Sequence, residues 1–183
     1  MGISELFCRG GQFKRAVEES RPRLFRMALA WCGQVDLADD LCQEALTRAL
    51  LNQQQLRSMD KFDAWIFTIL SNCWREHLRR RRPQVEFEES EHADGRRSIE
   101  EDHQVHTLVV LLKHQVARLP AMQRQVLTLV DLEEFSYAET ADILEIPLGT
   151  VMSRLHRARA QLRAQLNQVL GKEMDKPLLR RVK

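Results

Sequence analysis

Two blocks of this chain carry apolar residues at the spacing of amphipathic helices, and an acidic stretch that lacks this spacing separates them. In residues 10–83 and 106–171, apolar residues recur at i, i+3, i+4 and i+7, without a useful length of the alternation that strands require. The stretch between them is rich in Glu, Asp and Ser. The pattern predicts an all-α fold of two small helical domains, joined by a flexible acidic linker at residues 84–105 and followed by a basic tail at residues 172–183.

The charges divide along the same boundaries. Residues 1–83 carry 14 Lys and Arg against 10 Asp and Glu, residues 84–107 carry 2 against 8, and residues 108–183 carry 12 against 8. Two basic blocks beside an acidic connector suit two modules that contact one polyanion. A solvated linker produces the same segregation, so the charges alone leave both interpretations open.

Composition excludes several other classes of protein. With 44% hydrophobic and 30% charged residues, the chain has the composition of a folded globular protein. It contains no apolar run long enough to span a membrane, and its N-terminus has no secretion signal, so we expect a cytoplasmic location. The four cysteines, Cys8, Cys32, Cys42 and Cys73, form no C-x-x-C pair, which favours buried thiols over redox or metal sites.

The first block predicts three or four helices. The first covers about residues 12–32, and Pro22 should interrupt or restart it. The second begins near Asp36 and carries four acidic or amide residues close to its N-terminus: Asp39, Asp40, Gln43 and Glu44. Carboxylates there either stabilise the helix through its dipole or form a docking surface for a basic partner.

The third helix, from Asp60 to the arginines 79–82, has one apolar face and one polar face. The polar face carries Thr68, Asn72, Arg75 and Arg79 at i, i+4, i+7 and i+11. Hydrogen-bonding residues that lead into four arginines beside aromatic side chains fit nucleic-acid contact. A solvated helix end that complements the helix dipole would show the same arginines.

The second block contains a predicted helix-turn-helix. Helices are expected at residues 106–119 and 123–132, with a break at Pro120. Ser136 and Glu139 then form the S-x-x-E pattern of a capping box, and a further helix restarts at Pro147. Two short helices joined by a tight turn are typical of DNA-binding helix-turn-helix domains.

The last helix has the pattern of a recognition helix. Val151, Leu155, Ala158 and Leu162 should face inward. The outward face and its sides then carry residue types that reach base edges and phosphates: Thr150, Ser153, Arg154, His156, Arg157 and Arg159. A basic surface helix in some other bundle is the alternative.

Both blocks resemble the two domains of the extracytoplasmic-function (ECF) subfamily of sigma-70 RNA polymerase sigma factors. DLCQEA at residues 40–45 resembles the D-L-x-Q-E helix, and FDAWIFTILSN at residues 62–72 resembles the F-x-x-W-L-x-x-I-x-x-N stretch. The segment from Leu119 to Leu132, SYAETA at residues 136–141 and GTVMSR at residues 149–154 resemble the domain that reads the −35 promoter element.

The resemblance implies a role for each set of candidate residues. Asp39, Asp40, Gln43 and Glu44 would bind core RNA polymerase, at the clamp helices of the largest subunit. The −10 element would be read as single-stranded DNA by Lys61, Phe62, Trp65, Thr68, Asn72, Arg75 and Arg79. The last helix would read the −35 element as duplex DNA through the six residues named above.

The resemblance also implies the partners. They are core RNA polymerase, including its flap, promoter DNA, and an anti-sigma factor that is often membrane-bound. It implies no enzyme activity, cofactor, metal or small-molecule substrate. Met152 and His156 depart from the basic and aromatic residues common at these positions, so an unusual −35 sequence is expected.

Two other classes of function compete with this interpretation. A helix-turn-helix regulator would bind an operator without polymerase, with the first block serving for dimerisation or effector binding. An enzyme would need a catalytic site, for which only Glu76-His77 and the pair His103 and His106 are suggestive. Neither has the spacing of a catalytic metal site.

Overall fold

The computed structural model describes the backbone of residues 3–81 and 105–174, and the side chains of residues 11–80 and 111–167. All regular elements in these ranges are helices, which confirms the all-α prediction. The predicted linker lies outside the described residues except for Val105, and so does the predicted tail after residue 174. None of the described helices combines the length and apolarity needed to cross a membrane.

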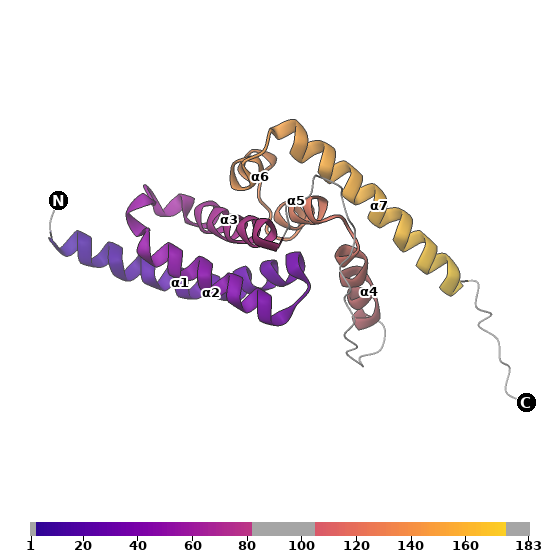
Figure 1. The fold of residues 1–183 in the computed structure, drawn as a ribbon, viewed down its shortest axis with the longest axis horizontal. Helices are drawn as coiled ribbons and strands as arrows, with labels where there is room; N and C mark the ends of the chain where they lie inside the picture. Colours follow the sequence, from indigo (N-terminus) through magenta and orange to yellow (C-terminus); the bar gives the residue numbers. More distant parts are fainter. Residues whose placement is uncertain (1–2, 82–104, 175–183) are drawn as a thin grey trace, which may run out of the picture.

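The first domain is built from α1 (Ile3–Cys32), α2 (Val35–Leu51) and α3 (Phe62–Arg81), which pack side by side (Figure 1). Two short 3-10 turns, η1 (Gln53–Gln55) and η2 (Met59–Lys61), connect α2 to α3. Gly33 reverses the chain between α1 and α2 at φ 71°, and its N–H donates to the carbonyl of Leu29. This left-handed conformation favours glycine, which has no Cβ to clash.

The expectation that Pro22 interrupts the first helix is wrong, because α1 continues through it. The helix buries side chains on both sides of the proline, including Val17 and Leu24, so packing holds the two halves in line. The proline itself is exposed. Nearby carbonyls find side-chain donors: Ser20 Oγ donates to Val17 O at 2.8 Å, and Cys42 Sγ donates to Arg21 O at 3.6 Å.

The second domain contains α4 (Val105–Ala117), α5 (Ala121–Asp131), α6 (Tyr137–Leu144) and α7 (Leu148–Met174). Helix α5 begins two residues before the predicted start, because the carbonyl of Pro120 already accepts from the N–H groups of Gln123 and Arg124. Helix α7 begins one residue after the predicted restart, with the carbonyl of Pro147 accepting from Val151. It is the longest element of this domain and leads away from the first domain (Figure 1).

The two domains pack against each other, with α1 beside α5 and α3 beside α6 (Figure 1). Trp31 Nε1 donates to Thr128 Oγ1 at 2.9 Å, and both side chains are almost completely buried. The rings of Phe67 and Phe135 meet edge to face, with their centroids 5.3 Å apart. No sequence pattern had predicted this interface.

The predicted capping box of α6 is confirmed. Ser136 Oγ accepts from the N–H of Glu139 at 3.2 Å, and the N–H of Ser136 donates to the Glu139 carboxylate at 2.9 Å. A further bond from Ser136 Oγ reaches the same carboxylate at 2.6 Å. These bonds to Ser136 lower the pKa of Glu139 below its ordinary value of 4.5.

We expect Ser136→Ala to lower the free energy of unfolding by about 1 kcal/mol, because the first turn of α6 loses its cap. The urea midpoint measures this loss. Ser153→Ala is the control, since that hydroxyl only donates to a carbonyl inside its own helix, and its midpoint should not change. Because the folded-state pKa of Glu139 is lowered, its contribution is complete above pH 4.5 and is lost as the pH falls through the folded value. Equal losses in the two variants would contradict the capping role.

Candidate nucleic-acid interface

The turn between α6 and α7 is tight and well defined. Helix α6 ends at Leu144, and its C-terminal capping residue, Glu145, adopts the left-handed conformation at φ 54°. The N–H of Ile146 donates back to the carbonyl of Ala141 at 3.0 Å, which closes the turn. Pro147 follows immediately, so α7 starts at a fixed angle to α6, as a helix-turn-helix requires.

The inward face of α7 is confirmed, since Val151, Leu155, Ala158 and Leu162 are all buried. Among the predicted −35 residues, Ser153, His156 and Arg157 are exposed, whereas Thr150 and Arg154 are half-buried. Met152 is also exposed by 52% and lies beside them on the helix. The outward face of α7 thus combines polar and basic residues with one thioether.

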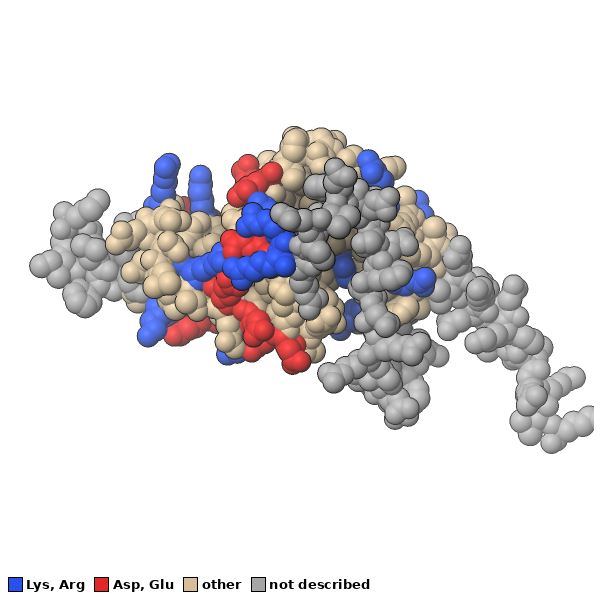
Figure 2. All heavy atoms as spheres, in the orientation of Figure 1, with Lys and Arg blue, Asp and Glu red and all other residues tan. Residues whose placement is uncertain are grey.

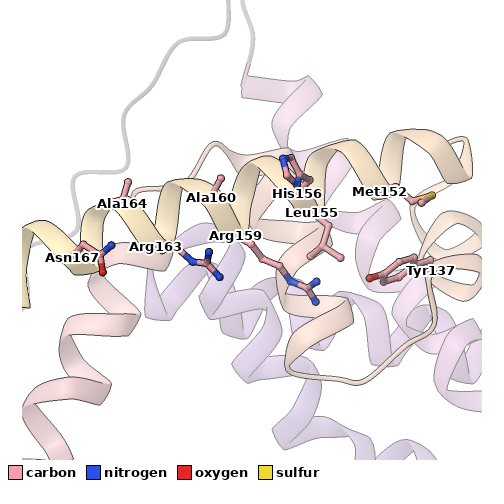
Figure 3. Close-up of a pocket in the computed structure, with 9 residues that line it drawn as sticks. All are labelled: Tyr137, Met152, Leu155, His156, Arg159, Ala160, Arg163, Ala164 and Asn167. Atoms are coloured by element: carbon pink, nitrogen blue, oxygen red, sulfur yellow. The ribbon is translucent and has the colours of Figure 1, made fainter.

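Arg159 is held by a neighbour. Its guanidinium forms a bidentate pair with Asp131 of α5, at 2.5 Å from Nη2 and 3.2 Å from Nε, and this contact raises its pKa. The side chain lies along an open groove on α7 that Tyr137, Met152 and Arg163 also line (Figure 3). The sequence indicated neither Asp131 as a partner nor Tyr137 and Arg163 as neighbours of this face.

The predicted −10 residues of the first domain differ in exposure. Phe62 is buried, with its ring centroid 5.9 Å from that of Phe13, and it supports the half-buried Trp65 at 6.3 Å. Lys61, Arg75 and Arg79 are exposed, whereas Thr68 and Asn72 are half-buried. The Thr68 hydroxyl donates to the carbonyl of Ala64, inside α3.

Arg75 is bound to the helix-turn-helix domain. Its Nη1 lies 2.8 Å from the Glu145 carboxylate, and its Nη2 donates to the carbonyl of Leu144 at 3.0 Å. The structure therefore joins a predicted −10 residue to the turn of the predicted −35 domain.

The predicted polymerase-binding residues lie along α2. Asp40 and Gln43 are exposed, and the Gln43 amide donates to Asp39 at 2.6 Å. Glu44 is half-buried and faces α3. Two exposed leucines, Leu50 and Leu51, end the same helix. Their position off the buried stripe of α2 was the signal that could have identified them.

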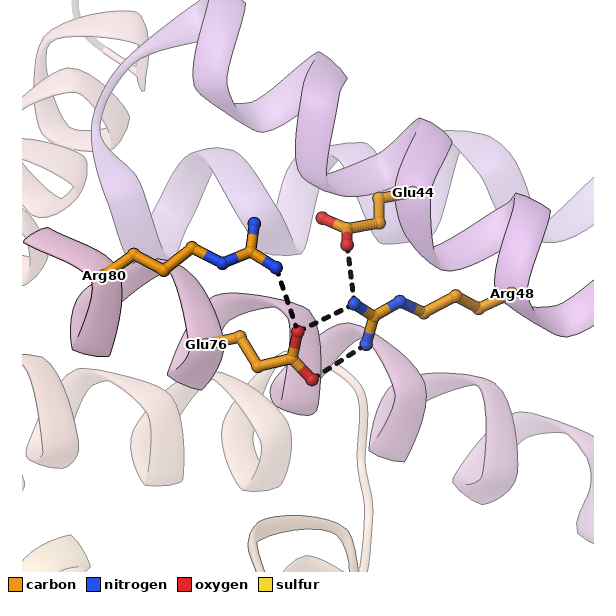
Figure 4. Close-up of polar contacts among 4 residues, drawn as sticks. All are labelled: Glu44, Arg48, Glu76 and Arg80. Atoms are coloured by element: carbon orange, nitrogen blue, oxygen red, sulfur yellow. Dashed lines mark hydrogen bonds and ion pairs between the residues drawn. The ribbon is translucent and has the colours of Figure 1, made fainter.

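Glu44 belongs to an ion-pair network that joins α2 to α3 (Figure 4). Arg48 Nη2 lies 2.6 Å from Glu44 and 2.7 Å from Glu76, and Arg48 Nη1 donates to Glu76 at 3.0 Å. Arg80 approaches Glu76 at 3.6 Å. The hydrogen bonds from Arg48 lower the pKa of Glu76. On the face of the molecule that Figure 2 shows, acidic and basic side chains lie next to one another near the middle of the chain's surface.

Glu76 and His77, which the sequence offered as candidates for a catalytic metal site, both contact other side chains. Glu76 is in the network just described, and the ring of His77 stacks on Trp74 with the centroids 5.7 Å apart. His103 and the side chain of His106 lie outside the described residues. Within the described part of the chain, no group of three or more His, Cys, Asp or Glu could hold a metal ion.

The cysteine prediction is confirmed for two residues. Cys42 and Cys73 are buried, and burial raises the pKa of the Cys73 thiol to about 11, so it stays protonated at neutral pH. Cys32 is only half-buried, and the side chain of Cys8 is outside the described residues.

Comparison with known proteins identifies both halves of the chain. Residues 16–84 match the family description "Sigma-70 region 2", and residues 110–162 match "Sigma-70, region 4". The ECF RNA polymerase sigma factor EcfG of Rhodopseudomonas palustris is 37% identical over 79% of this chain and 80% of its own. The ECF RNA polymerase sigma factor SigW of Bacillus subtilis is 30% identical over 84% of this chain and 88% of its own.

Solved structures show the same fold. The sigma factor RpoE of Bartonella quintana, crystallised with the anti-sigma factor NepR, has a TM-score of 0.66 at 29% identity. That match covers 85% of this chain and 97% of the RpoE chain. CnrH, in complex with the cytosolic domain of CnrY, has a TM-score of 0.59 at 22% identity, covering 88% and 96% of the two chains.

The fold and the two matched regions define a sigma factor of the sigma-70 type. Within this type, the chain belongs to the family of ECF RNA polymerase sigma factors. It binds core RNA polymerase and directs transcription initiation at specific promoters, which is the function that the resemblance implied.

We expect Arg48→Ala to lower the free energy of unfolding by about 1–2 kcal/mol, because Glu44 and Glu76 lose a charged donor between α2 and α3. The measurement is a urea titration of the full chain. Arg15→Ala is the matched control, since Arg15 pairs only with the exposed Glu19 on its own helix, and its midpoint should stay at the wild-type value. If both variants unfold at the wild-type midpoint, the network has no stabilising role.

Proposed function

We propose that each of the two domains reads one promoter element. Residues 106–171 form the −35 module, in which α7 enters the major groove of duplex DNA with Ser153, Arg154 and Arg157 toward the base edges and phosphates. Thr150, His156 and Arg159 flank this face. The observation that carries the proposal is the capped helix-turn-helix, whose second helix buries its apolar side and exposes a polar and basic one.

Residues 10–83 form the −10 module. Lys61 and Arg79 contact phosphates, and Trp65 offers a half-exposed ring on which an unstacked base can lie. Extracting a base from the duplex costs a few kcal/mol, which hydrogen bonds from Asn72 and stacking on Trp65 would offset. Buried Phe62 supports the Trp65 ring from beneath.

Polymerase docking makes the two modules effective together. Asp40 and Gln43 of α2 would contact the clamp helices of the largest subunit, with the exposed leucines 50 and 51 beside them. An apolar groove between α4, α5 and α7, lined by Leu112, Leu132 and Leu162 among others, suits the flap. Each module alone binds DNA weakly, but one enzyme holds both at high effective concentration over one promoter.

The protein would act in the cytoplasm, where the polymerase is, and would catalyse no reaction of its own. The RpoE structure with the anti-sigma factor NepR supports control by an anti-sigma factor here as well. Such a partner would cover the polymerase-binding surfaces until a signal releases them.

Run-off transcription with core RNA polymerase and a genomic promoter library tests the proposal. Discrete transcripts that share −35 and −10 sequences, and that require this protein, are the expected result. If polymerase gains no specificity while the protein alone shifts duplex DNA, an operator-binding regulator becomes the better description.

Asn72→Ala should impair opening of duplex promoters more than binding of pre-melted ones. The reason is that Asn72 would hold an extracted base, which matters only while the strands separate. Permanganate reactivity of unpaired thymines measures opening, and a bubble template measures binding after melting. Equal losses on both templates would count against a role in opening.

Met152→Arg should change the preferred base at one −35 position, because a thioether offers only apolar contact, for example to a thymine methyl, whereas arginine pairs with guanine. We expect a change of about 5- to 150-fold at that position, measured by sequencing bound members of a −35 library. Met122→Arg is the matched control: Met122 is exposed by 45% but lies on α5. An unchanged preference in Met152→Arg would show that this side chain does not face the bases.

A further inference from the structure

An open groove follows α7 from the −35 face toward the C-terminal half of the helix. It runs from Met152 at one end to Asn167 at the other, and Tyr137 of α6 lines its side (Figure 3). Its volume is about 640 Å³, which leaves room for a phosphodiester. His156 stands near the beginning of the groove, among the expected −35 contacts, whereas Arg163 lies near its far end. The groove therefore connects the −35 face to a cation outside the predicted site.

We propose that the DNA interface of α7 continues along this groove, and that Arg163 binds a backbone phosphate just outside the −35 element. The contact adds affinity for DNA and fixes the position of the helix. It adds no base preference, because phosphates are the same in every sequence. This inference rests on the proposed role of α7 as the −35 recognition helix.

Helix geometry places Arg163 on the side of α7 that faces the bases. Seven residues separate it from His156 and eleven from Met152. At about 3.6 residues per turn, these spacings are close to two and three whole turns, so the three side chains leave α7 in nearly the same direction. A rise of about 1.5 Å per residue puts Arg163 about 16 Å beyond Met152. The N-terminal residues of a recognition helix contact the base edges, and the major groove is only about 12 Å wide. Arg163 therefore lies past the bases, at the phosphates that border the groove.

Arg163 differs from Arg159 in its charge environment. Asp131 of α5 holds the Arg159 guanidinium through Nε and Nη2, at 3.2 and 2.5 Å. Arg163 is exposed, and no ion pair joins it to an acidic side chain in residues 11–80 or 111–167. A cation that is already paired inside the protein gains less from DNA, whereas an unpaired one releases a counterion when it binds a phosphate. The far end of the groove thus has the charge that complements the DNA backbone.

The neighbours of Arg163 suit the backbone of a DNA strand. Ala160 and Ala164 line the groove with methyl groups, so a strand can approach α7 closely. Asn167 is exposed one turn beyond Arg163, where its amide can donate to a phosphate oxygen of the same strand. Arginine and asparagine are both common donors to phosphate in protein–DNA complexes. The groove therefore offers a charged donor and a neutral donor in line.

The salt dependence of promoter binding tests the contact. The assay measures closed complexes of the full chain with saturating core RNA polymerase, on a promoter obtained by the run-off experiment. Each phosphate contact contributes about 0.9 to the slope of log K against log salt. Arg163→Ala should therefore make the slope shallower by about 0.9 and weaken binding about three- to eightfold at 0.1 M salt. An Arg163→Ala slope equal to the wild-type slope would overturn the proposal.

Two further variants separate the contact from general effects of charge. Arg163→Lys should keep most of the wild-type slope, because an ammonium group also binds phosphate as a point charge. Arg26→Ala is the matched control, since it removes one exposed cation from α1, and its slope should equal the wild-type slope. If Arg26→Ala lowers the slope as much as Arg163→Ala does, the effect belongs to net charge and the groove contact is wrong.

Ethylation interference locates the phosphate. Ethylation of one phosphate that borders the −35 element should reduce binding of the wild-type protein but not of Arg163→Ala. Base preferences in a −35 library should be the same for both proteins, because the contact carries no sequence information. A changed base preference in Arg163→Ala would show that Arg163 reads a base, which contradicts the proposal.

Failure of the proposed function gives a different result from failure of this inference. If polymerase gains no promoter specificity from the wild-type chain, α7 does not read a −35 element. If the wild-type chain selects promoters while Arg163→Ala keeps both its salt slope and its ethylation pattern, α7 retains its role. Only the phosphate contact is then wrong, and the groove is left to a protein partner.

Discussion

The position of α3 is the constraint on which the rest of the structure depends. Its buried face, with Ile66 and Leu70 completely covered, completes the core of the first domain. Phe67, the residue after Ile66, is also buried, but its ring contacts the ring of Phe135 in the second domain. A single helix thus belongs to two hydrophobic contacts, and its remaining polar face lies where the second domain can reach it. Any movement of the second domain changes what the polar face of α3 can touch.

Arginine side chains form the ion pairs that join helices within each domain and that join the two domains. Arg48 ties α2 to α3, Arg159 ties α7 to α5, and Arg23 and Arg75 tie one domain to the other. The guanidinium suits this work because its fixed fork binds two oxygens at once. The same geometry suits DNA phosphates. In a DNA-binding protein the internal partners of such arginines therefore influence which of them are available to DNA.

Much of the fold could be predicted from the sequence. The inward positions of α7 and the capping box at Ser136 followed from periodicity and local hydrogen-bond chemistry, and both are present. The break at Pro22 was wrong because local propensity was outweighed by burial on both sides of the proline. The Arg48–Glu76 ion pair and the contact between the Phe13 and Phe62 rings could not be predicted, since each joins two different helices and depends on how those helices cross.

The sequence by itself determined the helices, the division into two domains and the membership of the ECF sigma factors, because these depend on patterns of neighbouring residues. Only the tertiary structure decided which candidate DNA-binding residues are available. Arg75 and Glu145 are far apart in the chain and meet only because α3 packs beside α6. Local patterns show which residues face outward from a helix, but packing between domains decides whether solvent, DNA or another part of the chain lies against them.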